Sequence, residues 1–297
     1  TAPRWSPDGK EIAFLSNRGD KEKPPQIYII PFDGGEAYQL TSIQGAVRSF
    51  MWSPDGKQIL CEVVKTDPEV LDREKDEKKK KLGVVSRQYD RLFYKLDGFG
   101  YLPHERSHLW VINAKTGKAK QLTDHVVYDE GHPTWSPDGK WIVFTSNRSE
   151  NPDRELDLVD LYIIPADGGD FKKIEAPVGE KAMPSFSPDG KWLAYFGKEG
   201  ISVGYKNTDL WIVPLDGSQP AANLTASYDI HAGAWTINDV GRTEFMSPVW
   251  SKDGKTLYFQ VDRHGSTFVY SISLDGTGLN AIIGEGGAVG SFCFDKQ

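Results

Sequence analysis

The stretch Trp5-Ser6-Pro7-Asp8-Gly9-Lys10 decides the fold, because the same phrase recurs along the chain. In this phrase Pro presets φ at the second position of a turn, and Asp suits the third. Gly then takes the left-handed conformation that closes a type I turn with a bulge. An apolar or alternating run follows each copy and predicts a strand. The further copies begin at Trp52, Trp135, Phe186 and Trp250, and the last has Lys252 in place of proline.

A second phrase follows every copy and predicts the rest of a repeating unit. It is an apolar strand such as Ile27-Tyr28-Ile29-Ile30, followed by a turn such as Asp33-Gly34-Gly35. In four units a short last strand follows and ends in a phrase such as Gln39-Leu40-Thr41. Each unit is therefore four antiparallel strands, named A to D in chain order. The equivalents of the apolar strand start at Leu109, Leu161, Leu210 and Val269.

These units predict an all-β chain, a β-propeller of four-stranded antiparallel blades, since such units at a period of about 40–50 residues are typical of propellers. Five copies of a two-part signal disfavour a β-sandwich with coincidental turns. Residues 288–297 are expected to begin a further blade, because Ser291-Phe292-Cys293-Phe294-Asp295 aligns with Ser49-Phe50-Met51-Trp52-Ser53. We therefore expect 1–297 to be one propeller domain and a piece of a longer propeller protein. The five blades are expected at 1–41, 46–123, 131–175, 182–225 and 229–283.

Composition excludes several classes of protein. The 297 residues carry 35 basic and 42 acidic side chains and a net charge of −7, which argues against a nucleic-acid partner. No apolar run is long enough for a membrane span and no signal peptide is visible, so we expect a cytoplasmic chain with no membrane partner. Cys61 and Cys293 are interpreted as small core residues in a reducing compartment, with one disulfide between them as the alternative.

Insertions are predicted to gather on one face of the propeller. The A–B and C–D turns are short, whereas 65–107 and 147–158 lengthen B–C connections and 226–245 lengthens a connection between blades. Those two kinds of connection lie at the same ends of the blades, and function usually sits on elaborated loops. Within 65–82 carboxylates alternate with lysines, which favours a solvated loop or a short exposed helix over a nucleic-acid patch.

Catalytic motifs are absent or stand in the wrong context. His104-Glu105-Arg106-Ser107-His108 matches the zinc-peptidase pattern, which requires both histidines on one helical face. Pro103 precedes it and a strand follows His108, so the two imidazoles are not expected to converge. Gly200-Ile201-Ser202-Val203-Gly204 matches the G-x-S-x-G pattern, but it lies between two predicted strands of one unit, whereas a nucleophile elbow requires a turn from a strand into a helix. We expect no catalytic residue, no metal and no cofactor in this chain.

One segment is not explained by blade geometry, and it supplies the candidate site residues. It runs from Arg91 to Tyr101 and combines aromatic, basic and acidic side chains within an insertion. One interpretation is a hairpin whose aromatics cover the neighbouring blade. The other is a loop that lines an opening or contacts a partner domain. The candidate gating or interface residues are Arg91, Tyr94, Lys95, Asp97 and Tyr101.

The same segment carries a family resemblance. Tyr94-Lys95-Leu96-Asp97-Gly98-Phe99-Gly100-Tyr101, followed by Arg106-Ser107-His108-Leu109-Trp110-Val111, resembles the propeller of acylaminoacyl peptidases, which are serine peptidases of the prolyl oligopeptidase family. The resemblance implies a non-catalytic propeller that gates the access of short peptides to a partner α/β-hydrolase domain, which bears the catalytic residues. No catalytic residue is carried over to this chain, so its own enzyme status stays open. The alternative is a stand-alone TolB-like propeller that acts as a protein-binding module.

The first prediction follows from the absence of a serine motif in the strand-to-helix context that catalysis requires. Residues 1–297 expressed alone are expected to release no nitroaniline from peptide p-nitroanilides, since no activated serine is present. The assay follows absorbance against a buffer blank. Serine hydrolase activity of the purified chain, blocked by a fluorophosphonate, would overturn the assignment of a non-catalytic domain.

Overall fold

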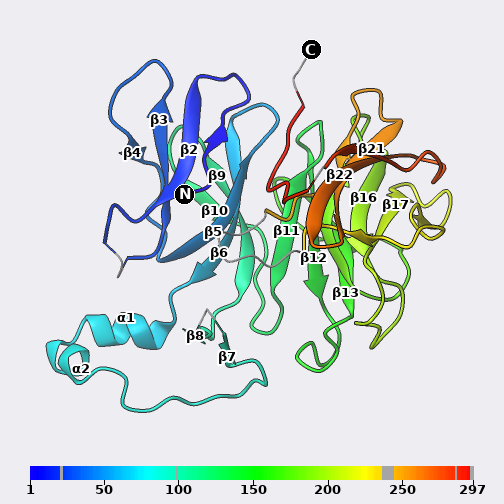
Figure 1. Ribbon diagram of the computed structural model, residues 1–297. Helices are drawn as coiled ribbons and strands as arrows, with labels where there is room; N and C mark the ends of the chain where they lie inside the picture. The colour runs from blue at the N-terminus through cyan, green and yellow to red at the C-terminus, as the bar shows by residue number, and fades with distance from the viewer. Residues whose placement is uncertain (21–22, 98–99, 236–243, 285, 295–297) are drawn as a thin grey trace. The chain divides into compact units, whose positions relative to one another are not determined.

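The computed structural model describes residues 1–20, 23–97, 100–235, 244–284 and 286–294, and in them the repeats form antiparallel sheets (Figure 1). In the first two sheets the strands follow one another by hairpin connections, so that each sheet runs in the order A to D. The first contains β1 (Arg4–Trp5), β2 (Glu11–Ser16), β3 (Gln26–Pro31) and β4 (Tyr38–Gln39). The second contains β5 (Gly45–Trp52), β6 (Gln58–Lys65), β9 (Ser107–Asn113) and β10 (Ala119–Gln121).

The next two sheets repeat this order, and the fifth adds a strand. The third contains β11 (Glu130–Trp135), β12 (Trp141–Asn147), β13 (Val159–Pro165) and β14 (Lys172–Lys173). The fourth contains β15 (Lys181–Phe186), β16 (Trp192–Gly197), β17 (Asp209–Pro214) and β18 (Ala222–Asn223). The fifth contains β19 (His231–Ala232), β20 (Val249–Trp250), β21 (Thr256–Arg263), β22 (Ser266–Ser273) and β23 (Asn280–Ile283).

The repeated turn forms as its residue types predict. The Ser6 hydroxyl donates a hydrogen bond to Asp8 Oδ1 at 2.7 Å and accepts one from the Glu11 amide at 3.0 Å. Gly9 has a φ of +70°, the left-handed conformation in which any other residue is strained. The hydrogen bond from Ser6 holds the pKa of the Asp8 carboxyl below its usual value. The same serine-to-aspartate bond recurs at Ser53, Ser136, Ser187 and Ser251.

A threonine at the end of strand D joins strands C and D. The Thr225 side chain is fully buried; its hydroxyl accepts from the Leu210 amide at 3.0 Å and donates to Asp209 Oδ1 at 2.9 Å. Thr41 and Thr123 make the equivalent bonds to the amides of Ile27 and Leu109. The threonine of the Leu-Thr ending therefore has a structural role. Its hydroxyl accepts a hydrogen bond from a strand-C amide that no backbone carbonyl of strand D reaches.

The third blade lacks this threonine and uses an ion cluster instead. Asp160, at the start of β13, lies 2.6 Å from Lys173 Nζ and 3.1 Å from the Nζ of the buried Lys181. Lys181 also donates to the Gly179 carbonyl at 3.0 Å. Burial lowers the pKa of Lys181, and Asp160 opposes that shift.

The chain divides into two compact units, each with its own core. The first comprises Thr1–Pro133, Asn147–Leu156 and Ala166–Gly169. Its core joins the first two sheets through Ala13, Ile27, Ile29, Ile59, Cys61 and Ile112, all with no exposed surface. The second comprises Thr134–Ser146, Asp157–Pro165 and Asp170–Gln297.

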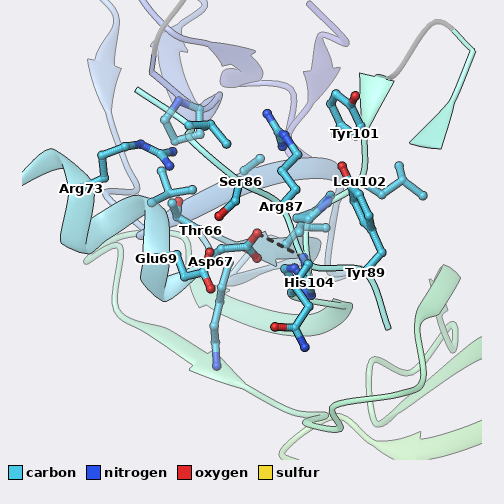
Figure 2. Close-up of a pocket in the computed structure, with 18 of the residues that line it drawn as sticks. Thr66, Asp67, Glu69, Arg73, Ser86, Arg87, Tyr89, Tyr101, Leu102 and His104 are labelled. Atoms are coloured by element: carbon cyan, nitrogen blue, oxygen red, sulfur yellow. Dashed lines mark hydrogen bonds between the residues drawn. The ribbon is translucent and has the colours of Figure 1, made fainter. Parts of the chain in front are cut away.

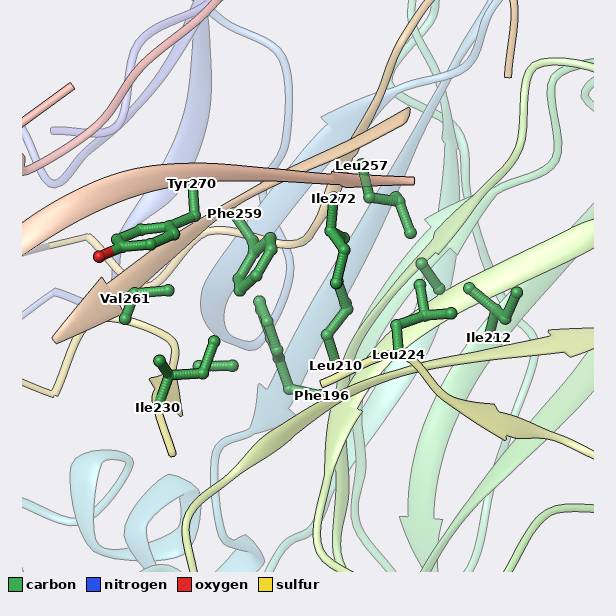
Figure 3. Packing of buried hydrophobic residues seen from close by; sticks show 12 residues of the cluster. Phe196, Leu210, Ile212, Leu224, Ile230, Leu257, Phe259, Val261, Tyr270 and Ile272 are labelled. Carbon is green, nitrogen blue, oxygen red and sulfur yellow. The ribbon is translucent and has the colours of Figure 1, made fainter. Parts of the chain in front are cut away.

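The second unit has a core between the fourth and fifth sheets (Figure 3). Phe196 and Phe259, whose ring centroids lie 6.4 Å apart, lie at its centre with Leu210 and Ile272. Burial of an aromatic or branched side chain of this size contributes about 1.5–3 kcal/mol each. A smaller cluster that includes Leu161, Leu193 and Trp211 also lies in this unit.

Three details differ from the expectations. The insertion in the fifth blade interrupts strand A instead of preceding it, because β19 and β20 both pair with β21. Gly233 opens this break with a φ of +112°, where a Cβ would come within 2.4 Å of Phe245. Cys293 is exposed, so only Cys61 is a core residue, and both thiols are free.

The expected strand from Ala288 appears as one isolated bridge to Thr267, and the residues described after it are not in a strand. A further blade at 288–297, and a single propeller domain over 1–297, therefore stay predictions. No helix in the described ranges is long and apolar enough to cross a membrane.

The second prediction tests the strand-D threonine. Thr225→Val leaves the Leu210 amide without its acceptor inside the blade, and we expect a loss of about 1–3 kcal/mol in the free energy of unfolding. Thr256→Val, a strand threonine whose hydroxyl has no such role, is the matched control and should stay within about 0.5 kcal/mol of wild type. Urea denaturation measures both. Equal effects of the two substitutions would contradict the role assigned to Thr225.

Candidate functional site

The second blade carries an insertion between β6 and β9 that forms its own small structure. It contains α1 (Pro68–Glu74), α2 (Glu77–Leu82) and a hairpin of β7 (Lys95–Leu96) and β8 (Gly100–Tyr101) (Figure 1). Two short helices therefore replace the expected solvated loop or single helix. Pro68 begins α1, and the Asp76 carboxylate caps α2 by accepting from the amides of Lys78 and Lys79. A carboxylate that stands among the lysines thus has a local structural role.

One carboxylate closes the neck of the insertion. Asp67 Oδ2 accepts from the His104 amide at 3.1 Å, and Oδ1 accepts from the Glu105 amide at 2.9 Å. These bonds join the start of the insertion to its end. Charge-assisted bonds of this kind are about twice as strong as neutral ones.

A second carboxylate holds the insertion against the B–C connection of the next blade. Asp153, in the 147–158 insertion, binds Arg91 through both of its oxygens, at 2.6 Å to Nη2 and 3.2 Å to Nε. It also accepts from the Leu92 amide at 3.1 Å. The two side chains are only 20% and 14% exposed, so solvent screens the pair weakly. Arg91 lowers the pKa of the Asp153 carboxyl. The 65–107 and 147–158 insertions therefore contact each other at this ion pair.

The hairpin bears a cluster of exposed tyrosines. Tyr89 lies with its ring centroid 4.4 Å from that of Tyr94 and 5.9 Å from that of Tyr101. Arg87 lies 4.1 Å over the Tyr101 ring, and Lys95 Nζ lies 5.6 Å from it. The aromatics thus stack on one another and on cations, which fixes their orientation while leaving them accessible.

A cavity of about 450 Å³ lies between this cluster, α1 and the ends of β5 and β6 (Figure 2). Its volume is within the range of about 300–1,000 Å³ typical of ligand sites. Figure 2 shows Arg73 on one side of the space and Tyr89 and Tyr101 on the other, with Asp67 and His104 joined by their hydrogen bond. The labelled lining residues are Thr66, Asp67, Glu69, Arg73, Ser86, Arg87, Tyr89, Tyr101, Leu102 and His104.

The five candidate residues have different surroundings. Tyr94, Lys95 and Tyr101 belong to the tyrosine cluster, and only Tyr101 lines the cavity. Arg91 points instead to Asp153, and Asp97 is exposed in the hairpin turn. Their gating or interface role stays a prediction.

Sequence reasoning missed Asp67, Arg73, Arg87 and Asp153, which shape the cavity and hold the insertion. Asp67 and Asp153 act on segments far along the chain, so no local spacing identifies them. Arg87 lies two residues before Tyr89, so the alternation of basic and aromatic residues there is a local signal that identifies it.

The motif from His104 to His108 is not helical, and its two histidines have separate partners. His104 lies on the exposed loop, 3.8 Å from Asp90. His108 is buried on β9, with Nδ1 2.8 Å from Glu130 Oε2. Glu130 is itself buried and also binds Thr123 and Arg148. His108 therefore belongs to the polar group at the strand-D threonine, a structural position.

The chain is similar in sequence to a propeller family and to two peptidases. Residues 100–210 match the family described as TolB beta propeller domain. The chain is 38% identical over 283 residues to the uncharacterized peptidase YuxL of Bacillus subtilis, covering 93% of this chain and 41% of that protein. It is 28% identical over 293 residues to dipeptidyl-peptidase 5 of Porphyromonas gingivalis, covering 92% and 39%. The chain thus spans about two fifths of the length of these curated relatives.

Solved structures show the fold. The chain aligns with acylaminoacyl peptidase from Pyrococcus horikoshii at a TM-score of 0.68 and 20% identity, covering 100% of this chain and 40% of the other. It aligns with the β-propeller domain of the Trilobed protease from Pyrococcus furiosus at a TM-score of 0.64 and 18% identity, covering 100% and 72%. The five sheets are therefore blades of a β-propeller, and the fold prediction is confirmed. The chain thus folds as a β-propeller, matches the TolB beta propeller domain over residues 100–210, and resembles the propellers of acylaminoacyl peptidases and related peptidases, as the segment around Tyr94 indicated.

Proposed function

We propose that this chain is the non-catalytic propeller of an acylaminoacyl peptidase-like serine peptidase, and that it gates the access of short peptides to an α/β-hydrolase domain of the same protein. The hydrolase domain and the peptides are its partners. The free thiols of Cys61 and Cys293 support a reducing, cytoplasmic compartment.

One observation carries the proposal: the Arg91–Asp153 ion pair joins two insertions that leave the same ends of consecutive blades. An insertion that only covered a blade would not require an ion pair to the insertion of the next blade. Two loops clamped by a weakly exposed, bidentate pair form a rim whose opening can be set by one interaction. The peptidase names of the relatives support the class of reaction.

The exposed tyrosines and cations on the same insertion support a role toward peptides. Tyr94 and Tyr101 are 45% and 48% exposed, so part of each ring stays open to a ligand although both contact neighbouring side chains. Tyr and Arg side chains contribute strongly at surfaces that bind peptides. An accessible surface of this kind at the rim fits a path along which a peptide travels.

The alternative is a stand-alone TolB-like propeller that binds proteins. The match over 100–210 and the alignment with TolB from Acinetobacter baumannii, at a TM-score of 0.56 and 19% identity, favour it. The reading frame of the full-length gene distinguishes the two. A hydrolase domain encoded in the same frame excludes the stand-alone module.

The third prediction tests gating in the full-length protein. Arg91→Ala and Asp153→Ala release the two insertions from each other. We expect kcat/KM for decapeptide substrates to rise about threefold or more, a barrier change of at least about 0.65 kcal/mol, while dipeptide kinetics stay unchanged. The double substitution should add nothing to either single one, since both remove the same pair.

Arg154→Ala, on the same insertion and exposed, is the matched control and should change neither substrate. Equal kinetics of wild type and both variants across a series of peptide lengths would refute gating by these loops. A parallel rise for dipeptides would assign the ion pair to catalytic positioning instead.

The fourth prediction follows from the lowered pKa of Asp153. A carboxyl whose folded pKa lies below the usual value of about 3.9 stabilises the folded state at higher pH, and this contribution is lost as the pH falls through the folded pKa. We therefore expect the Leu92 amide, which binds Asp153, to keep its hydrogen-exchange protection above about pH 4 and to lose it below.

Exchange measured by mass spectrometry on the purified chain, corrected for intrinsic rates, tests this. Asp153→Asn removes the titrating group, so its protection at 91–93 should be weak and independent of pH. A pH-dependent loss that persists in Asp153→Asn would contradict the assignment.

A further inference from the structure

The cavity of Figure 2 is lined by an excess of cations that come from four separate places in the fold. Arg48 is on β5, Lys65 ends β6, Arg73 is on α1, and Arg87 precedes the hairpin. Because these residues lie far apart in the sequence, their meeting is a property of the folded insertion. No local run of basic residues produces it.

These cations have no carboxylate partner in the part of the chain that the structure describes. Arg87 lies over the Tyr101 ring at 4.1 Å, and Lys65 lies 5.8 Å from the Trp110 ring. Arg48 and Arg73 make no side-chain hydrogen bond or ion pair within the same described ranges. By contrast, nearby Arg91 is fully used by Asp153. Guanidinium groups left available at a cavity wall are suited to bind a carboxylate through two parallel bonds.

The acidic side chains of the wall do not cancel this charge. Asp67 accepts two backbone amides, one with each of its oxygens, so both oxygens are engaged in structural hydrogen bonds. Glu69, on the first turn of α1, is the other carboxylate of the wall. Four cations against two carboxylates leave the lining positive, although the whole chain has a net charge of −7.

The shape and the remaining lining favour a short peptide over other anions. Tyr89 and Tyr101 form an aromatic wall beside the cations, which suits a ligand with both carboxylates and apolar or aromatic groups. A nucleic acid would need a longer positive track along the surface, and the acidic balance of the chain opposes one.

The geometry points to a binding site for acidic peptides in this cavity: Arg73 and Arg87 bind carboxylates of the peptide, and Tyr89 and Tyr101 pack against it. This inference rests on the proposed function, since it names the class of peptide that the insertion selects. The proposed function selects peptides by their length, and this inference adds a preference for peptides that carry negative charge.

The fifth prediction is tested by binding to the purified chain. The probe is a fluorescent, N-acetylated pentapeptide with three glutamates and one tyrosine, compared with the same peptide carrying three glutamines. We expect the acidic peptide to bind about tenfold or more tightly at low salt, and to weaken as NaCl is raised. Arg73→Gln/Arg87→Gln should remove at least about fivefold of this preference, since two charge-assisted contacts are lost.

Lys78→Gln/Lys118→Gln is the matched control, because it removes two charges of the same sign at exposed positions outside the cavity. It should keep the preference within about twofold, as a screened surface charge does. Arg73→Lys/Arg87→Lys, which keeps the charge, should recover part of the binding. Thermal melting of each variant shows whether it is folded, and the peptide comparison on wild type alone tests the site if one variant is not.

Several outcomes would overturn the inference. They are equal binding of the two peptides, an equal loss in the lysine control, or tighter binding of a single-stranded oligonucleotide than of the acidic peptide. Displacement of the peptide by equimolar inorganic phosphate would also overturn it, since any small anion would then suffice.

The full-length protein separates this inference from the proposed function. If it hydrolyses peptides but Arg73→Gln/Arg87→Gln leaves the ratio of kcat/KM for acidic and neutral peptides unchanged, the charge preference fails and the proposed peptidase function is not contradicted. If it hydrolyses no peptide while the chain still binds the acidic one, the proposed function fails and the binding site stands.

Discussion

The placing of the insertions depends on the hydrogen bonds that the serine hydroxyl makes within each A–B turn. It accepts the amide five residues on and donates to the aspartate two residues on, as Ser6 does toward Glu11 and Asp8. This fixes the number of residues in the A–B turn of the blade. Additional sequence can enter after strand B, where the helices and the hairpin of the second blade lie. The location of the candidate site is thus a consequence of a turn at the opposite end of the sheet.

Carboxylates organise the insertion in the way that backbone ladders organise the blades. Asp67, Asp76 and Asp153 each accept backbone amides, and Asp153 adds a guanidinium. Neither helix of the insertion has a buried residue, so the two helices contribute no hydrophobic core. Charge-assisted bonds take the place of that core. They also explain why a segment rich in charge can hold a defined cavity.

The fold could be predicted from the sequence because each blade repeats a local signal. A left-handed Gly9, an apolar strand and the ending at Thr41 are all read within a few residues. The interruption of strand A at Gly233 could not be predicted, because it depends on the packing of Phe245 against that glycine. The candidate site was located but not resolved. Tyr94, Lys95 and Tyr101 were found by composition, whereas Asp67 and Asp153 act across loops and leave no periodic trace.

The neck at Asp67 has a consequence for how such a protein can diversify. Both ends of the insertion emerge from paired strands, β6 and β9, and one carboxylate draws those ends together. The two ends of the insertion therefore leave the blade close together, and the blade does not depend on the length of the insertion between them. A cassette of different length or chemistry could be transplanted at this boundary while the strand pairing beneath stays the same. Recognition could then evolve in the cassette independently of the scaffold.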